Sequence, residues 1–424
     1  MRAAAVDISP LRESPAFRRM FFGQTVSIVG SQVTQVAVAL EVYDITGSSL
    51  YVGLIGVVGL VPLIIFGLYG GAIADAVDRR RLILFTSLGM MAVSVVLLVQ
   101  AAMHARSVAL LFACVAVQSA FTAIDSPTRR AVIPQLIDAE KLPAANTISM
   151  GGFQFGIIAG PMIAGVAVGT GGFSWAYAVD VATFVGALYG ALRLPRLPAA
   201  ADAAPAGLRS VVEGLRFIGR SKVVMMTFLV DVIAMVFGMP RALFPALATH
   251  LYHGGAGTAG LLYAAPAVGA LIATLLGGAI ARVNRQGLGI VIAIAGWGAA
   301  IAIFGLVSSL WIGLVMLAVA GAADTVSAVY RSTMLQVATP PSMQGRLQGV
   351  FIVVVNGGPR LGDLEAGVAA AVSPQFAVVS GGLACIVGMA ICAVAVPAFL
   401  VYDHRDAARA MRAVNATPTE PDVI

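Results

Sequence analysis

Ionisable side chains occur inside apolar stretches long enough to cross a lipid bilayer, where a charge is costly and is usually kept for function. Two of them, Asp231 and Asp324, have no basic residue within four positions along the chain. At 1.5 Å per helical residue, each lies about 12 Å from the nearer end of its stretch. A carboxyl group at that depth resists ionisation and can exchange a proton. The sequence therefore predicts proton coupling at Asp231 or Asp324.

Other polar side chains in these stretches could contact a polar substrate. Arg241 stands about 27 Å along its stretch and would favour an anionic compound. Arg360 and Asp363 are three residues apart on one helical face, which predicts an ion pair within the membrane. Asp180 is predicted to bond with a neighbouring helix. The remaining candidates for lining a substrate cavity are Gln24, Gln32, Gln35, Glu41, Asp125 and Asn356.

Several of these candidates have a structural alternative. Glu41 could cap the outer end of its helix together with Asp44, and Asp125 could bond with Arg129 four residues later. The glutamines and Asn356 could equally bond between helices. All four histidines fall at or beyond the ends of the apolar stretches, which argues against a buried imidazole relay. The three cysteines lie inside apolar stretches and read as small buried side chains, so no metal site is predicted.

The elements that carry these residues are membrane helices. Of the 424 residues, 59% are hydrophobic and 11% are charged, and a soluble chain of that composition could not cover its own surface. At about 20 residues per crossing, twelve crossings fit and leave no room for a soluble catalytic domain. The first stretch has no cleavage site, which excludes a removable signal peptide. The expected crossings lie near 17–43, 50–74, 82–103, 107–126, 144–169, 173–193, 223–249, 257–281, 287–308, 310–333, 347–371 and 375–400.

Basic residues assign the two faces of the membrane. With this division, 23 of the 26 Lys and Arg residues fall in the termini and in the connections that follow even-numbered stretches, or within three residues of them. Only Arg106 falls on the other side, so the positive-inside rule places both termini in the cytoplasm. Ser308 and Ser309 alone interrupt the hydrophobicity between stretches nine and ten, which makes eleven helices the competing count. Eleven helices would scramble the charge asymmetry.

An internal repeat divides the chain into halves. The pentapeptide Gly-Gly-Ala-Ile-Ala at 70–74 recurs at 277–281, an offset of 207. Parallel repeats of this kind place a substrate site between two bundles at mid-membrane. The predicted organisation is an N-terminal cytoplasmic tail at 1–16, a six-helix bundle at 17–193, a cytoplasmic linker at 194–222, a second six-helix bundle at 223–400 and a cytoplasmic tail at 401–424.

A loop signature follows the first copy of the repeat, and through it the chain resembles the major facilitator superfamily, whose members read G-x-x-x-D-R/K-x-G-R/K-R/K there. Ala76 and Asp78 depart from that pattern. The resemblance implies an all-α membrane fold in which helices one, four, seven and ten line the cavity. A carboxylate at a helix C-terminus needs an external donor, so Asp75 is expected to meet Arg346 in a conformational latch, unless the loop is merely a solvated basic connection. The matching residues are Gly71, Asp75, Arg79 and Arg80.

A second motif lies in the fifth stretch and resembles the superfamily's antiporter motif, G-x-x-x-G-P-x-x-G-G, which is associated with exporters. Small residues four apart let helices touch, and the proline bends its helix. The alternative is an ordinary packing motif. Patches at 15–18, 260–265 and 333–346 resemble the enterobactin-exporter and drug-efflux branch of the superfamily. The matching residues of the motif are Gly156, Gly160, Pro161 and Gly165, with Ala164 in place of one glycine.

These observations predict a secondary transporter rather than an enzyme: a proton-coupled exporter of a small metabolite, siderophore or drug that works by alternating access. A uniporter or nutrient importer is the alternative, and a membrane-embedded transferase is disfavoured because no carboxylates cluster at a membrane face. No cofactor is expected beside the proton gradient. The expected partners are a small-molecule substrate and the lipid bilayer, with no nucleic acid, and the chain is expected to be a monomer. Arginine outnumbers lysine by 24 to 2, which is typical of a GC-rich bacterial genome and places the chain in a bacterial inner membrane.

Overall fold

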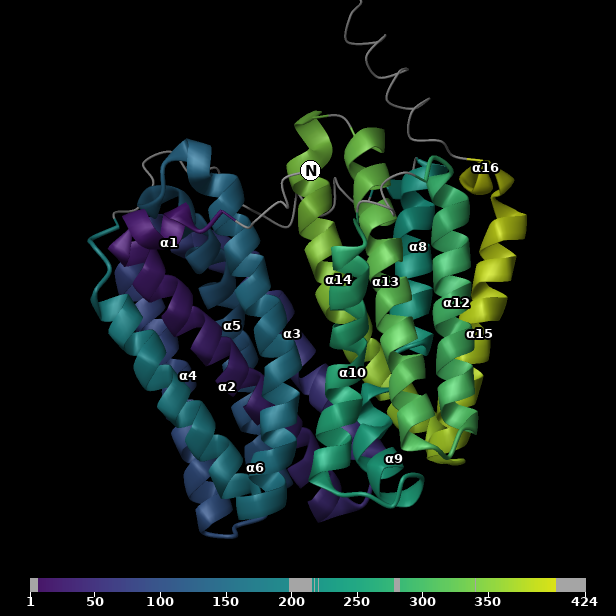
Figure 1. The fold of residues 1–424 in the computed structure, drawn as a ribbon, viewed down its shortest axis with the longest axis horizontal. Helices are drawn as coiled ribbons and strands as arrows, with labels where there is room; N and C mark the ends of the chain where they lie inside the picture. The colour runs from purple at the N-terminus through teal and green to yellow at the C-terminus, as the bar shows by residue number, and fades with distance from the viewer. Residues whose placement is uncertain are drawn as a thin grey trace, which may run out of the picture.

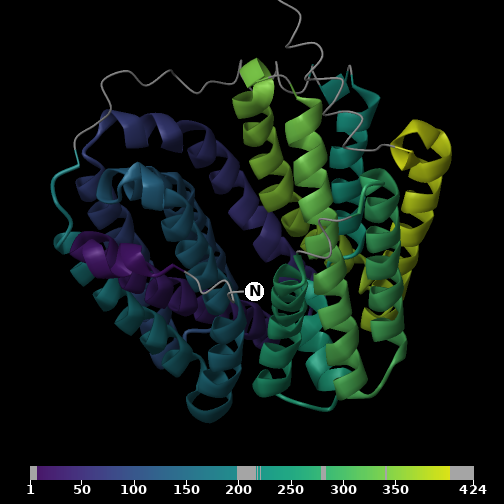
Figure 2. The ribbon, with the colours of Figure 1, turned by 45° about the horizontal axis from the view of Figure 1, so that its top comes forward.

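The structure is a computed structural model of the 424-residue chain. It describes residues 7–197, 216, 218–219, 221–277, 283–339 and 341–401, with the backbone alone at 68–76, 338, 341–346 and 348–353. Throughout these residues the only regular secondary structure is helical. The helices form two bundles that lie side by side, as Figures 1 and 2 show from two directions.

The N-terminal bundle contains six membrane passes. Its last element, α6, is two passes joined at Gly172, whose backbone φ of 73° is a left-handed value that glycine adopts without strain. Three helices follow a residue whose side chain accepts a hydrogen bond from the first turn: Ser14 before α2, Asp78 before α4 and Ser107 before α5. These caps fix where the three helices begin. The elements are α1 (Ser9–Glu13), α2 (Pro15–Thr46), α3 (Ser49–Ala76), α4 (Arg79–Ala102), α5 (Val108–Leu136), η1 (Ala139–Lys141) and α6 (Leu142–Leu192).

The C-terminal bundle contains six further passes. Its first pass is broken into α8, η2 and α9, and a short α16 follows its last pass. The elements are α8 (Lys222–Phe237), η2 (Arg241–Leu243), α9 (Phe244–His250), α10 (Ala256–Leu275), α12 (Gln286–Leu306), α13 (Leu310–Ala338), α14 (Pro341–Ala369), α15 (Pro374–Ala395) and α16 (Pro397–Leu400).

The twelve-helix fold is confirmed. Ten stretches of the described chain are long and apolar enough to cross a membrane; Ala139–Leu192 holds two passes, and α14 is the twelfth. The separation of passes nine and ten at 307–309 is also confirmed. Two helix ends were predicted too short. α5 continues to Leu136 and α13 to Ala338. Arg129 therefore lies inside a helix and not in a connection.

The two bundles contact each other at the end opposite α1 and α16. Glycines make the contact possible. A Cβ at Gly165 of α6 would lie 2.8 Å from the Ala256 carbonyl oxygen of α10. A Cβ at Gly367 of α14 would lie 2.8 Å from the Ser49 carbonyl oxygen of α3. On the same side, Tyr43 of α2 and His250 of α9 are hydrogen bonded at 3.1 Å. Toward α1 and α16 the bundles diverge (Figure 1). The structure is therefore closed at one end.

The break in the seventh pass positions Arg241. α8 ends at Gly238, and Pro240 cannot supply the N–H that a continuous helix would need there. The Gly238 carbonyl, freed by the break, accepts a hydrogen bond from the Trp297 indole of α12 at 2.9 Å. The backbone is therefore satisfied although the helix is interrupted. η2 then begins with Arg241 facing the opposite bundle.

Candidate substrate cavity and buried charge clusters

A cavity of about 310 Å³ lies between the two bundles, and we call it the central cavity. Four helices of the N-terminal bundle, α2, α3, α5 and α6, form most of its wall, and η2, α10 and α14 complete it. The polar lining of the first wall carries no charge, whereas the second wall supplies every charged side chain. The polar residues are Ser31, Gln32, Thr34, Gln35, Gln118, Ser119 and Thr122 on one side and Arg241, Tyr263, Arg360 and Asp363 on the other.

The charges of the cavity pair differently from the prediction. Asp363 of α14 bonds with Arg241 of η2, with 3.5 Å between Nη2 and Oδ2. The expected ion pair between Arg360 and Asp363 is wrong, because Arg360 points across the bundle interface toward α3. Its guanidinium lies against Gly59, where a Cβ would be 2.7 Å from Arg360 Nη1 and 2.8 Å from Ser119 Oγ.

The central cavity has one positive charge in excess. Two guanidinium groups face one carboxylate, and Nη1 of Arg360 and Nε of Arg241 are buried without a hydrogen-bond partner. Buried N–H groups of a cation normally find an acceptor, because leaving them unpaired costs free energy. The cavity is therefore chemically suited to an anion with several acceptor oxygens.

A second charge cluster lies inside the C-terminal bundle, and we call it the arginine-bridged cluster. Arg331 of α13 forms a direct ion pair with Asp231 of α8 and lies 3.6 Å from Asp324, two turns earlier in α13. Neither carboxylate has a basic residue within four positions along the chain, yet both lie near Arg331 in the fold. The Asp231 and Arg331 side chains are 2% and 3% exposed, whereas that of Asp324 is 32% exposed. Asp324 is the more exposed carboxylate of the cluster.

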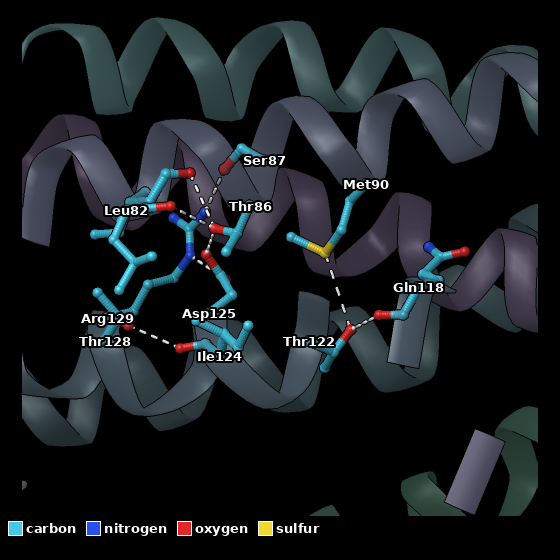
Figure 3. Close-up of polar contacts among 11 residues, drawn as sticks. Leu82, Thr86, Ser87, Met90, Gln118, Thr122, Ile124, Asp125, Thr128 and Arg129 are labelled. Carbon is cyan, nitrogen blue, oxygen red and sulfur yellow. Dashed lines mark hydrogen bonds and ion pairs between the residues drawn. The ribbon is translucent and has the colours of Figure 1, made fainter. Parts of the chain in front are cut away.

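Asp125 does not line the central cavity. It bonds with Arg129 one turn later, at 2.5 Å between Oδ2 and Nε, and accepts a second hydrogen bond from Thr86 at 2.7 Å. The Arg129 guanidinium also donates to Ser87 at 2.8 Å. Figure 3 shows these side chains turned toward one another between α4 and α5. The alternative of a structural pair is confirmed, and the predicted place of Asp125 in the substrate cavity is wrong.

Two further carboxylates lie buried between α2, α4 and α6 and have no cationic partner among the described residues. Glu41 accepts hydrogen bonds from the Tyr177 phenol at 2.5 Å and from the Gln100 amide at 2.8 Å. It faces the bundle interior, so its predicted place in the cavity is wrong. Asp180 is fully buried and accepts hydrogen bonds from hydroxyl groups on both neighbouring helices.

The structure places two of the four predicted amides at the central cavity. Gln32 and Gln35 are three residues apart on α2, so both face the opposite bundle. Gln24 and Asn356 are not among the residues that line it. Contact of any of them with substrate stays a prediction.

The proposed latch falls largely outside the described residues. Nothing is described for the side chains of Asp75 and Arg346, and Gly71 is described only as part of the α3 backbone, so their contact stays a prediction. The two arginines of the motif are anchored within the N-terminal bundle. Arg79 donates to the Ala131 carbonyl at 3.3 Å and Arg80 to that of Leu192 at 2.8 Å.

The glycine motif of the fifth pass works as a close-contact surface on two sides. Gly156 and Gly160 face α2, where a Cβ would lie 2.4 Å from Ile28 and 2.3 Å from Gln32. Gly165 and the Pro161 carbonyl face Gly260 of α10 in the other bundle. The motif therefore links a cavity-lining helix to the interface between bundles.

Sequence reasoning missed Arg331, Gln118, Ser119 and Tyr263. Arg331 had a detectable signal, since it follows Asp324 by seven residues and two helical turns return to the same face. The other three carry no such signal. A neutral polar side chain in a membrane helix does not by itself indicate which neighbour it faces.

A twelve-pass helical fold of two bundles that touch at one end, with a polar cavity between them, is typical of a membrane transporter. The chain matches the transmembrane secretion effector family over residues 5–418, and it belongs to that family of the major facilitator superfamily.

Relatives with assigned names support this classification. The chain is 30% identical over 388 residues to the enterobactin exporter EntS of Citrobacter koseri, covering 91% of this chain and 92% of the relative. It is 30% identical over 385 residues to the enterobactin exporter EntS of Escherichia coli, covering 90% and 92%. These relatives are transporters, and the chain is a multi-pass membrane transporter of a small molecule and not an enzyme.

Solved structures share the fold at low identity. The nucleoside transporter NupG superposes with a TM-score of 0.71 at 12% identity, covering 91% of this chain and 98% of that one. The D-xylose-proton symporter superposes with a TM-score of 0.71 at 12% identity, covering 92% and 98%. A bacterial homologue of the lysosomal transporter Spinster, in an inward-facing and unoccupied conformation, gives 0.68 at 17% identity and covers 95% and 98%.

Proposed function

We propose that this protein is a proton-coupled exporter of a small anionic metabolite of the siderophore class. The observation that carries the proposal is the unbalanced charge of the central cavity. Arg241 and Arg360 face a single carboxylate, Asp363, and a bound anion would remove the excess positive charge. The relatives named enterobactin exporters favour a siderophore, which presents many acceptor oxygens on an apolar frame.

The neutral wall of the cavity complements that charge. Gln32, Gln35 and Gln118 offer amide donors and acceptors from the N-terminal bundle, and Val36, Ile55 and Val115 of the same lining are apolar. An amphipathic substrate would place its anionic end against η2 and α14 and its apolar part against α2, α3 and α5. The two ends of one molecule would then contact both bundles, as alternating access requires.

The proposed direction of transport follows from the placement of the open end. We place α1 and α16 on the cytoplasmic side, because the basic connections lie there. The structure, closed at the other end, is then inward-facing and loads substrate from the cytoplasm. The Gly-Pro motif of α6 and its similarity to exporter motifs favour export over import.

The arginine-bridged cluster provides the proposed coupling site. Two carboxylates share one guanidinium, so a single proton makes the cluster neutral. Asp231 is directly paired and almost fully buried, whereas Asp324 is partly exposed. We assign the exchangeable proton to Asp324 and the role of permanent counterion to Asp231. Proton exchange at Asp324 would change the charge of the bundle that also binds the anion.

Transport in everted membrane vesicles tests the proposal. The vesicles come from a host that lacks its own siderophore exporters, and enterobactin is the probe. We expect accumulation that requires an acidic vesicle interior and stops when a protonophore is added. A matched vesicle preparation carrying Arg241→Gln should accumulate the probe poorly at low concentration.

Three outcomes would contradict parts of the proposal. Uptake that only equilibrates enterobactin across the membrane, with or without the proton gradient, indicates a uniporter. Uptake confined to right-side-out vesicles indicates an importer. Accumulation of neutral and cationic compounds in preference to enterobactin, with Arg241→Gln unchanged, removes the anionic substrate class.

A further inference from the structure

Asp180 is the most deeply buried of the described carboxylates of the N-terminal bundle. Its residue is 0% exposed, and no basic side chain forms an ion pair with it among the described residues. It stands eight residues past the Gly172 bend, which is about 12 Å into the second pass of α6. An ionised carboxylate without a cation is very unfavourable at that depth. Asp180 therefore meets the physical conditions for holding a proton.

The surroundings of Asp180 are hydroxyl groups from three passes. Thr34 of α2 and Ser94 of α4 both donate to Oδ2, at 2.7 and 2.6 Å. Thr183 donates to the Asp180 backbone carbonyl at 2.7 Å and lies 3.5 Å from Oδ1. Gly30 of α2 leaves the space for Oδ1, since a Cβ there would lie 2.5 Å from that oxygen.

Among the described residues, the helices packed against Asp180 bring no opposite charge to it. α2 contributes Thr34 and Gly30 at this level, and α4 contributes Ser94. The neighbouring titratable groups along the same seam are Glu41 and Tyr177, which are hydrogen bonded to each other. Tyr177 precedes Asp180 by three residues in α6. No arginine or lysine in the described part of the chain forms an ion pair with any of these groups.

Thr34 connects this buried carboxyl group to the central cavity. Its side chain is among those that line the cavity, and its hydroxyl donates to Asp180 Oδ2. Ser94 donates to the same oxygen but does not line the cavity. A hydroxyl group can accept one hydrogen bond while it donates another. Thr34 is thus positioned to pass a proton between the cavity and Asp180.

We propose that Asp180 is a second proton-binding site of the transporter, separate from the arginine-bridged cluster, and that Thr34 is the relay between it and the central cavity. The inference deepens the proposed proton coupling and rests on it for its role in transport. The protonation of Asp180 itself does not depend on the substrate. Uptake or release of this proton would change the charge of the wall that faces Arg241 and Arg360.

Infrared spectroscopy of the purified, unliganded protein tests both parts. A protonated carboxyl group has a distinct carbonyl stretch that shifts on deuteration. We expect such a band at neutral pH, lost in Asp180→Asn. After transfer to D₂O the band should shift at least about tenfold more slowly in Thr34→Val, while Thr34→Ser retains the rate of the unmodified protein. Ser94→Ala is the matched control, because it removes a hydrogen bond to the same oxygen without touching the cavity.

The outcomes separate this inference from the proposed function. Absence of an Asp180 carboxyl band at neutral pH overturns the proton site, even if the protein exports enterobactin. If the Asp180 band shifts in D₂O at the same rate in Thr34→Val and Ser94→Ala, Thr34 is not the proton relay. If Asp180→Asn does not fold, exchange in the two hydroxyl variants still decides the relay. In vesicles, Asp180→Asn should flatten the pH profile of transport relative to Glu41→Gln, whereas a purely structural Asp180 would lower the rate equally at every pH.

Discussion

The two bundles are related by an internal repeat, yet, apart from the Asp125–Arg129 pair of the first bundle, they hold their buried carboxylates in different ways. At the repeat offset of 207, Thr34 of the first bundle corresponds to Arg241 of the second, and Gln24 to Asp231. In the first bundle, Asp180 accepts hydrogen bonds from hydroxyl groups, and Glu41 accepts hydrogen bonds from a phenol and an amide group. In the second bundle every carboxylate of the two clusters is near an arginine.

This difference separates two tasks. A carboxylate beside a guanidinium is held in its charged form, because the pair stabilises both charges in a low-dielectric surrounding. A carboxylate among hydroxyl groups has donors but no charge to balance it, so the neutral form is favoured. In the second bundle, Asp231 and Asp363 thus carry fixed charge, and Asp324, which shares one guanidinium with Asp231, is the carboxylate to which we assign an exchangeable proton. The first bundle presents a neutral wall, and Glu41 and Asp180 lie buried behind it with neutral hydrogen-bond donors.

The largest expected effect comes from removing the arginine that bridges the second bundle. Arg331→Met leaves Asp231 buried without its partner, and we expect the free energy of unfolding to fall by about 3–5 kcal/mol. Thermal unfolding in detergent measures this loss. Asp180→Asn is the comparison in the first bundle: its amide oxygen still accepts from Thr34 and Ser94, so the expected loss is below about 1 kcal/mol.

A rescue experiment distinguishes charge from shape at Arg331. Neutralising both acids, with Asp231→Asn and Asp324→Asn added to Arg331→Met, should recover much of the lost stability because no unpaired charge remains. Equal unfolding temperatures for Arg331→Met and the unmodified protein would show that the bridge does not hold the second bundle together.

The next effect concerns coupling. Asp324→Asn should abolish accumulation driven by the proton gradient while exchange of labelled for unlabelled substrate continues, because exchange needs no net proton movement. Asp125→Asn is a control in the first bundle, since Asp125 is already held by Arg129. Gradient-driven accumulation that survives Asp324→Asn would move the coupling site out of the arginine-bridged cluster.

Substrate affinity should change less, and unequally across the two walls. Arg241→Gln removes a charge-assisted hydrogen bond worth about 1.5–3 kcal/mol, which is roughly a 10- to 150-fold loss of affinity. Gln35→Ala removes a neutral bond worth about 0.5–1.5 kcal/mol, roughly a two- to tenfold loss. Titration of the purified protein with enterobactin measures both. Equal losses at the two positions would mean that the cavity does not discriminate by charge.

The sequence predicts the fold well and the side-chain partners poorly. Twelve apolar stretches and their alternating basic connections follow from the thickness of the bilayer and the cost of moving charge across it. Partners such as Asp363 and Arg241, or Asp180 and Thr34, come from passes far apart in the chain. Their meeting depends on how each helix is rotated about its axis, which apolar length does not determine.

Particular errors show where this limit lies. Arg360 and Asp363 share a helical face, as their spacing predicts, and both line the central cavity, which their spacing did not indicate. The partner of Asp363 is Arg241, which follows the helix break at Pro240. The helical periodicity of α14 cannot indicate a partner from another pass. Glu41 was assigned to the cavity because its helix lines it, yet the side chain faces the opposite side of α2, toward Tyr177.

The smallest expected effect concerns how the bundles touch, and two glycines of α3 offer a matched pair. A Cβ at Gly56 would lie 2.6 Å from the Arg360 carbonyl oxygen of the second bundle, whereas a Cβ at Gly67 meets nothing within 4 Å. Gly56→Ala should therefore disfavour the described conformation by about 1 kcal/mol, roughly a fivefold change in its ratio to the other conformers. Gly67→Ala should leave the ratio unchanged and stabilise the helix by about 0.5–1 kcal/mol. Distances between spin labels on α3 and α14 report the populations directly. If Gly56→Ala and Gly67→Ala change the conformer populations alike, the contact between α3 and α14 is too loose to control the change between conformations. The closed end must then be held by α6 and α10.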